Sequence, residues 1–347
     1  MLFRKLLLFS LLVIITEQLF YHAILKEKLP AFWGNEEVYA KVNYLGKHPE
    51  INAVFIGSSK VKTQIEPSVF DSVTNGRTTS FNLGCNGLFI PESFNIVDYI
   101  LDSLQLKTIF YEIRPVYHIY KENLHITRTI YYHTNSSYWT TLQNAFHSNI
   151  PFARRVNTYA TFTIARIENM LNFNVADGYI SFKNFDVETL SGQYKTNGGC
   201  FIMGNGSGDP LKQSHAELDG RAAISVDYMK RYQSDSLSEI KYNNIYLAEI
   251  QRIIKKAKDK NVQLVLIFPS ALREFEYREI LPLLREIPTT PKFIIADATA
   301  FPDLYRVENN FETDHLNGKG AKLYSIDLGE AFNDAFPPTS VNSSVIQ

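Results

Sequence analysis

A short apolar run that ends in Gly-Ser-Ser constrains the fold of this chain more than any other stretch. Val54, Phe55 and Ile56 are strand formers, and an unbroken apolar run is typical of a strand buried on both faces of a sheet. Gly57 permits a tight turn, so a serine just after it would project from the carboxyl end of the strand. Ligands bind at this edge of open α/β sheets, and a serine there can be a nucleophile if a base reaches it.

Four more stretches of strand character alternate with helical patterns along the chain. These predicted strands are residues 79–84, 106–113, 262–268 and 292–296. Helical spacing of apolar residues predicts helices over residues 91–104, 241–260, 271–287 and 316–332. Strands that alternate with helices form parallel sheets. We therefore predict an α/β fold, a flavodoxin-like three-layer sandwich with about five parallel strands.

The regular alternation breaks between residues 116 and 240. Several aromatic residues crowd one part of this region and glycine-rich loops mark another. We interpret residues 116–240 as an insertion or cap over the carboxyl edge of the sheet, with the aromatic group as its core rather than a platform for sugars. We assign residues 51–335 to the domain that carries the insertion, residues 26–50 to a linker and residues 336–347 to a disordered tail.

Residues 1–25 have the order of an export signal. Arg4 and Lys5 precede an apolar run over residues 6–15, which is too short to span a bilayer and matches the core of a signal peptide. Apolar residues continue to Leu25 without a clear cleavage site, which favours an uncleaved signal anchor over a removed signal. The alternative is an amphipathic helix packed on a cytosolic domain. We expect a membrane-anchored protein outside the cytoplasm, periplasmic or at the cell surface, or a secreted one if the signal is cleaved.

The composition argues against several classes of protein. A formal net charge of -1 does not favour nucleic acid as a partner. The histidines and cysteines have no zinc-binding spacing, so we predict no metal, and we predict no cofactor. Cys85 and Cys200 could pair in an oxidising compartment or remain thiols.

A histidine flanked by acids precedes the last predicted helix. Residues 310–321 read Asn-Phe-Glu-Thr-Asp-His-Leu-Asn-Gly-Lys-Gly-Ala. Together with Gly-Ser-Ser at 57–59 and Asn-Leu-Gly-Cys-Asn-Gly at 82–87, this motif makes the chain resemble the SGNH (GDSL-type) hydrolases. The resemblance covers the sheet scaffold from about residue 52 to 332, except the insertion. Each motif alone is weak, since Gly-Ser-Ser can be a plain turn and Glu-Thr-Asp-His a helix cap. It is their joint occurrence in order that predicts an active site.

The resemblance implies roles for single residues. Ser59 takes the position of the nucleophile, with Ser58 in place of the aspartate that the family has before its serine. His315 would be the general base, and the backbone amides of Ser59 and Gly87 would form the oxyanion hole.

Two departures from the family pattern concern the acid and the oxyanion hole. The family acid lies three residues before the histidine, which favours Glu312, and Asp314 beside the histidine is the alternative. The third strand ends in Glu112-Ile113-Arg114, without the asparagine that often serves in the oxyanion hole, so Arg114 is a weak substitute candidate. Loss of one oxyanion donor typically costs about 10²- to 10³-fold in rate.

An N-terminal anchor joined to such a domain resembles exported family members that work beside membrane acyltransferases. This implies acyl transfer or ester hydrolysis on an envelope or extracellular glycan through an acyl-Ser59 intermediate. The implied partners are an acylated glycan or acyl donor and a membrane-bound acyltransferase. One alternative is a non-catalytic envelope component that binds a glycan or a membrane partner. Another is a flavodoxin-like domain whose serines hold a phosphate.

Overall fold

In this computed structural model, five parallel strands form one sheet. Their bounds are Ala53–Ile56 (β1), Ser80–Asn82 (β2), Thr108–Glu112 (β3), Gln263–Phe268 (β4) and Lys292–Ile294 (β5). They lie in the order β2-β1-β3-β4-β5, and every neighbouring pair is parallel. All five fall on the predicted stretches, so the prediction of an α/β fold with five parallel strands is confirmed. The order is that of flavodoxin-like sheets, whose switch point lies between β1 and β3.

The structure describes most of the sheet domain and parts of the region from 116 to 240. The described residues are 2–20, 22–23, 31–32, 34–88, 90–115, 138–139, 142–143, 152–171, 187–203, 220–233, 243–271 and 273–337. Most of the aromatic group expected in the insertion, its glycine-rich loop and the expected tail from residue 338 lie outside these residues.

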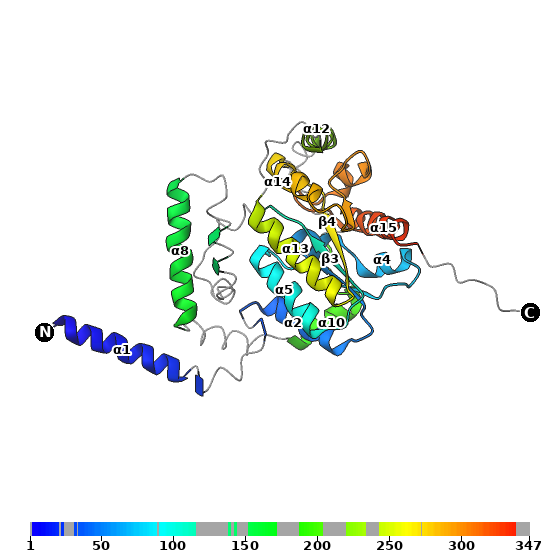
Figure 1. The fold of residues 1–347 in the computed structure, drawn as a ribbon. Coiled ribbons are helices and arrows are strands. Elements are labelled where there is room, and N and C mark those ends of the chain that lie inside the picture. Colours follow the sequence, from blue (N-terminus) through cyan, green and yellow to red (C-terminus); the bar gives the residue numbers. More distant parts are fainter. Residues whose placement is uncertain are drawn as a thin grey trace, which may run out of the picture.

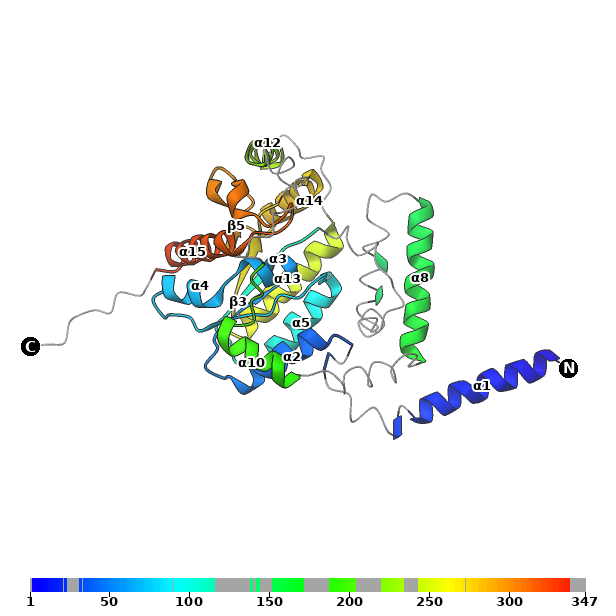
Figure 2. The ribbon, with the colours of Figure 1, turned by 180° about the vertical axis from the view of Figure 1, so that it is seen from behind.

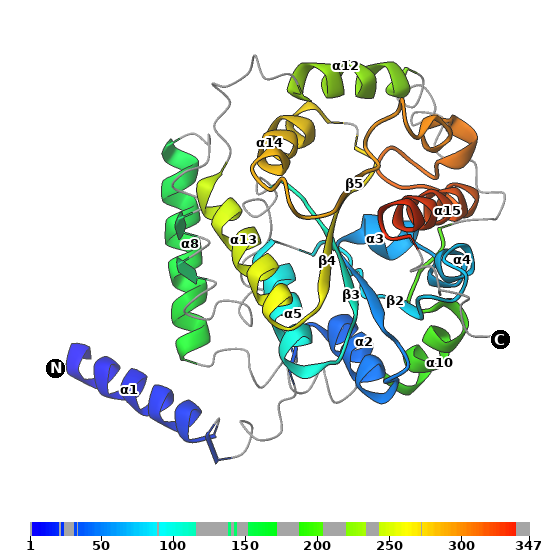
Figure 3. The ribbon, with the colours of Figure 1, turned by 45° about the vertical axis from the view of Figure 1, so that its right-hand side comes forward.

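Helices cover both faces of the sheet (Figure 3). One face packs against α2 (Glu36–Lys47), α5 (Ile90–Ser103), α13 (Asn244–Asp259) and α14 (Glu274–Arg285). The other packs against α3 (Ser59–Gln64), α4 (Pro67–Val73) and α15 (Gly318–Ala335). Two short 3-10 turns, η4 (Pro302–Tyr305) and η5 (Val307–Asn309), precede α15. These three layers agree with the predicted sandwich.

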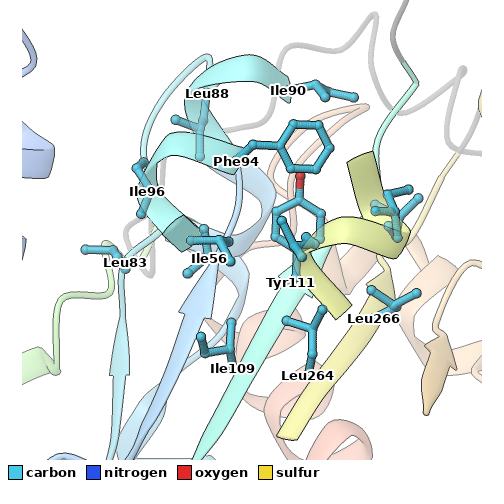
Figure 4. Close-up of a cluster of buried hydrophobic side chains, with 14 of the residues drawn as sticks. Ile56, Leu83, Leu88, Ile90, Phe94, Ile96, Ile109, Tyr111, Leu264 and Leu266 are labelled. Atoms are coloured by element: carbon cyan, nitrogen blue, oxygen red, sulfur yellow. The ribbon is translucent and has the colours of Figure 1, made fainter. Parts of the chain in front are cut away.

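Alternate side chains of the central strands fill two separate cores. Val54 and Ile56 of β1 enter the first core together with Tyr111 of β3, whereas Phe55 of β1 enters the second. Figure 4 shows the first core, where Ile56 and Tyr111 lie beneath side chains of α5 such as Phe94. Both faces of β1 are therefore buried, which is why its sequence is an unbroken apolar run rather than an alternating one.

Helix α2 lies inside the stretch that we expected to be a linker. Asn35 caps the helix by accepting the backbone N–H of Val38 at 3.3 Å. The side chains of Val38, Val42 and Leu45 are buried in the first core. Residues 36–47 therefore belong to the folded domain, and the linker assignment does not hold for them.

Further helices lie beside the sandwich: α1 (Leu2–Phe20), α8 (Phe152–Met170), α10 (Val187–Asn197) and α12 (Arg221–Gln233). Helix α10 packs against α2, and α12 packs against α14, so these two parts of the predicted insertion flank the layers. Figures 1 and 2 show α1 and α8 together on one side of the molecule, away from the sheet. Among the residues that the structure describes, none of the helices is both long and apolar enough to cross a membrane.

Candidate active site

Ser59 and His315 meet at the carboxyl edge of the sheet. The Ser59 Oγ atom lies 2.8 Å from Nε2 of His315, although 256 positions separate the two residues in the chain. Ser59 is the first residue of α3, directly after β1, and His315 lies in the loop before α15. Both are partly buried. The structure thus brings together the serine and the histidine that the sequence singled out.

Ser58 has a different partner from its neighbour. Its side chain is buried, and its Oγ donates a hydrogen bond to Oε1 of Glu112 at 3.0 Å. The backbone N–H of Ser58 donates to the other oxygen of the same carboxylate. Ser58 Oγ also accepts the N–H of Lys60 at 3.2 Å and so caps α3. The pair of serines is therefore split: Ser58 fixes the turn, and Ser59 faces the histidine.

The turn itself requires a glycine at position 57. A Cβ atom on Gly57 would lie 2.4 Å from Oε2 of Glu112 and 2.4 Å from a methyl group of Val61. A side chain here would displace either the carboxylate or the start of α3. The close packing of Gly57 thus sets the direction in which the next two residues leave the strand.

The loop before α15 is folded tightly around the histidine. The carbonyl of His315 accepts the backbone N–H groups of Phe311 at 2.9 Å and Glu312 at 3.2 Å. Asn317 then caps α15 by accepting the N–H of Gly320 at 3.0 Å. A Cβ on Gly320 would lie 2.0 Å from a backbone carbonyl of this loop, so only glycine permits the close approach. These contacts hold Glu312 and His315 on one turn.

Glu312, not Asp314, contacts the histidine ring. Oε1 of Glu312 pairs with Nδ1 of His315, the nitrogen opposite the one that faces Ser59. The Asp314 carboxylate instead pairs with the guanidinium of Arg273 at 2.7 Å. This is the arrangement favoured from the three-residue spacing, because adjacent side chains usually point in different directions along a turn.

The order serine, imidazole, carboxylate defines what the site can do. A carboxylate at Nδ1 favours the tautomer with a proton on that nitrogen, which leaves Nε2 as an acceptor for the Ser59 hydroxyl proton. It would also stabilise the imidazolium that forms after proton transfer. The geometry is therefore that of an activated serine nucleophile.

Arg221, at the start of α12, is a contact that the sequence did not reveal. Its guanidinium is buried and donates to Oδ1 of Asn310 at 3.3 Å and to the carbonyl of Thr313 at 2.6 Å. Burial lowers the pKa of Arg221 to about 10, and the nearby carboxylates of Asp314 and Glu312 partly offset this, so the group is charged at neutral pH. A helix of the predicted insertion thus holds the loop that carries the histidine.

Gly87 lies in the loop after β2, and the Arg114 side chain contacts this loop at the next residue. Gly87 is exposed and has a left-handed backbone with a φ of 57°. Arg114 donates to the carbonyl of Leu88, and its Nε lies 3.6 Å from Oε1 of Glu112. The Arg114 side chain is therefore engaged by the loop after Gly87 and by the Glu112 carboxylate.

Glu112 occupies the strand end where the resemblance places an asparagine. It is buried, and it lines a narrow pocket together with Gly57, Ser58, Leu88, Ile90, Ser93 and Arg114. The sequence showed that the asparagine was missing, but it did not show that the glutamate would bind Ser58. That contact depends on the pairing of β1 with β3, which places residues 56 and 111 side by side.

The remaining expectations concern metals and thiols. No group of three or more histidine, cysteine or acidic residues is placed to hold a metal ion in the part of the chain that the structure describes. Cys85 and Cys200 are buried thiols that are not joined in a disulfide. No protein-family model matches this chain.

Proposed function

We propose that this protein is a serine-dependent acyltransferase or esterase that works through an acyl-Ser59 intermediate. The observation that supports the proposal is the contact of Ser59 Oγ with Nε2 of His315 at 2.8 Å, with Glu312 on the other ring nitrogen. This arrangement lies at the switch point of a parallel sheet and combines a nucleophile, a base and a group that orients the base.

The proposed reaction has two halves. In the first, Ser59 Oγ attacks the carbonyl carbon of an ester while Nε2 of His315 takes the hydroxyl proton. The C–O bond to the leaving alcohol then breaks, the alcohol receives the proton from His315, and the acyl group remains on Ser59. In the second half, water or a sugar hydroxyl gives its proton to His315 and attacks the acyl carbon. The bond to Ser59 breaks, Ser59 regains the proton, and an acid or a new ester is released.

The tetrahedral intermediate of each half carries a negative oxygen. We assign its stabilisation to the backbone amides of Ser59 and Gly87, as the resemblance to SGNH hydrolases implies. Glu112 stands where a further donor would be expected, and a carboxylate cannot donate to an oxyanion while it is ionised. The proposed enzyme is therefore a slow or specialised esterase rather than a broad one.

The substrate class and location are part of the same proposal. The order of Arg4, Lys5 and the apolar residues after them supports export, and an exported enzyme of this kind would meet envelope or extracellular glycans. The acyl donor would be an acylated glycan or a group delivered by a membrane-bound acyltransferase.

The experiment is active-site labelling of the purified full chain with a fluorophosphonate probe. We expect a covalent adduct on Ser59, located by mass spectrometry of the digested protein. Ser59→Ala should abolish the adduct, whereas Ser58→Ala is the matched control and should keep it at a reduced rate. An adduct that survives in Ser59→Ala and is lost in Ser58→Ala would contradict the assignment.

A non-catalytic envelope component is the second candidate, and the Glu112 carboxylate beside Ser58 is the observation that favours it. The same experiment separates the two functions. Absence of any adduct on the folded wild-type chain, together with binding of an acylated glycan, would support the second candidate.

A further inference from the structure

Exposed apolar side chains are concentrated on one part of this molecule. Among the described residues, the large exposed apolar side chains lie mostly on α1 and within residues 138–170. Elsewhere they are Phe201, Ile202 and Ile224. Soluble proteins rarely expose large contiguous apolar patches, and such patches mark surfaces that contact protein or membrane.

Helix α8 carries the most regular part of this surface. Its exposed apolar residues are Phe152, Val156, Ile164, Ile167 and Met170, spaced by three, four and eight positions, which places them on one face of a helix. Phe152 is 79% exposed and Met170 is 60% exposed, so the apolar face is open from one end of the helix to the other.

A neighbouring side of α8 is already packed. Phe162 is buried in the first core, and the Tyr159 hydroxyl donates to the carbonyl of Leu142 at 3.1 Å. Thr163 and Tyr138 share a hydrogen bond of 3.0 Å between their hydroxyl groups. The helix is therefore held along a side that borders its apolar face, and the apolar residues beyond that border remain exposed.

We propose that the apolar face of α8, together with Trp139, lies in the interface of a lipid bilayer. An interfacial helix combines an apolar face with arginine or lysine residues and a low overall hydrophobicity. The sequence of α8 has three arginines and one glutamate, so its charge suits an anionic lipid surface. Trp139 is 61% exposed beside this helix, and tryptophan is enriched at the level of lipid headgroups.

The position of α1 favours a bilayer over a protein groove as the occupant. Exposed apolar side chains are found on every side of α1, and α1 lies on the same side of the molecule as α8 (Figures 1 and 2). A groove on a partner would cover one helix face, whereas a lipid surface can cover both helices at once. The membrane contact of this chain therefore extends beyond its N-terminal segment, and this inference does not depend on the chemistry of Ser59.

The test places an environment-sensitive fluorophore on the face in question in the full chain. Ile167→Cys is labelled with NBD, and Ile224→Cys on α12 serves as the matched control for an exposed apolar position outside the surface. The natural thiols are buried, and labelling of the wild-type chain measures their background. Vesicles of phosphatidylcholine and phosphatidylglycerol at a ratio of about 3:1 are then added.

We expect the NBD emission at position 167 to shift to the blue and to become protected from dithionite, while position 224 does not change. Val156→Asp in the Ile167→Cys chain should reduce that protection without a change in far-UV circular dichroism. Emission that stays unchanged at position 167 with vesicles would overturn the proposal. A blue shift that grows with protein concentration in the absence of vesicles would also overturn it, in favour of a second copy of the chain.

Discussion

At the scale of single residues, two adjacent serines have divided roles because a strand turns into a helix between them. Ser58 is the last residue before α3 and points to Glu112, and Ser59 is the first residue of the helix and points to His315. The sequence alone places both serines at the end of the strand and does not distinguish them. Only the resemblance to a family motif favoured Ser59, and in the structure Ser59 is the serine that contacts His315.

The first prediction concerns the two acids beside His315. Glu312→Ala removes the group at Nδ1, so the imidazole loses its orientation and the charged form loses a partner; we expect the rate of phosphonate labelling at Ser59 to fall by about 10²- to 10⁴-fold. Asp314→Asn is the matched control, since this carboxylate pairs with Arg273 at the surface. It should keep labelling within a few-fold of wild type. Equal losses in both variants, measured by mass spectrometry over time, would contradict the assignment of Glu312.

At the scale of helices and strands, elements that are buried on all sides could be predicted from the sequence. A helix that buries both apolar and charged side chains could not. The strands could be predicted because both faces of β1, β3 and β4 are buried and their sequences are mostly apolar. Helix α2 was missed because a buried charge interrupts its apolar pattern. Lys41 is 1% exposed and donates to the carbonyls of Gly84 at 2.6 Å and Gly199 at 2.9 Å. These acceptors come from distant segments, so they could not be recognised from the sequence.

The second prediction is that α12 positions the histidine loop through Arg221. Arg221→Met leaves the acceptors on Asn310 and Thr313 without their donor, and a small displacement of the loop can cost about 10²-fold in rate. We expect labelling of Ser59 to fall by roughly 10- to 100-fold. Arg221→Lys should recover part of the loss, because an ammonium group can still donate to one acceptor.

The matched control for Arg221 lies on the same helix. Arg231 is partly exposed and pairs with Asp227 and Glu274 at the surface, so Arg231→Met should leave the labelling rate unchanged. The midpoint of urea unfolding, measured in parallel, distinguishes a displaced histidine loop from a destabilised fold. A wild-type labelling rate in Arg221→Met would contradict the prediction that α12 positions the histidine loop.

The third prediction concerns Asp327 on α15. Burial, and then repulsion from Glu330 and Asp303, raises the pKa of Asp327 to about 6 from its usual 3.8. The folded chain therefore binds this proton more tightly than the unfolded chain does. The free energy of unfolding therefore falls as the pH rises from about 4 to about 6, and it keeps the lower value at higher pH.

Asp327→Asn should remove the destabilisation caused by the ionised carboxylate. We expect the free energy of unfolding at pH 7.5 to rise by about 1 to 2 kcal/mol, less than the full pKa shift converts to, because the carboxyl stays partly solvated. The gain should be much smaller at pH 4, where the folded carboxyl is protonated and the unfolded one is about half ionised. Asp334→Asn, an exposed change on the same helix, should stay within about 0.5 kcal/mol of wild type at both values of pH. A gain for Asp327→Asn that is as large at pH 4 as at pH 7.5 would refute this account.

At the scale of the whole molecule, the topology decides which parts of the sequence become neighbours. The sheet order places β1 between β2 and β3, and the loop that carries His315 folds back to the end of β1. Ordered motifs on a parallel scaffold were therefore enough to predict that Ser59, His315 and Glu312 lie together. The role of Arg221 could not be predicted, because it depends on how a segment of the inserted region returns to the sheet.

The last prediction uses the two buried thiols as reporters of the whole fold. Cys85 and Cys200 are each 2% exposed, and burial above all raises the pKa of Cys200 to about 12. At pH 8 the thiolate of Cys200 is then roughly 10³-fold rarer than that of an ordinary cysteine.

We expect DTNB to modify neither residue in the folded chain within minutes and to modify both at once in guanidinium chloride. Gly46→Cys, at an exposed helix position with open space around it, is the control and should react immediately without denaturant. Because both thiols must become exposed before they react, their rate should follow the free energy of opening as denaturant is added. Rapid reaction of either natural thiol in the absence of denaturant would show that the first core, which includes Cys85, or the junction of α10 with the sheet opens far more easily than its packing implies.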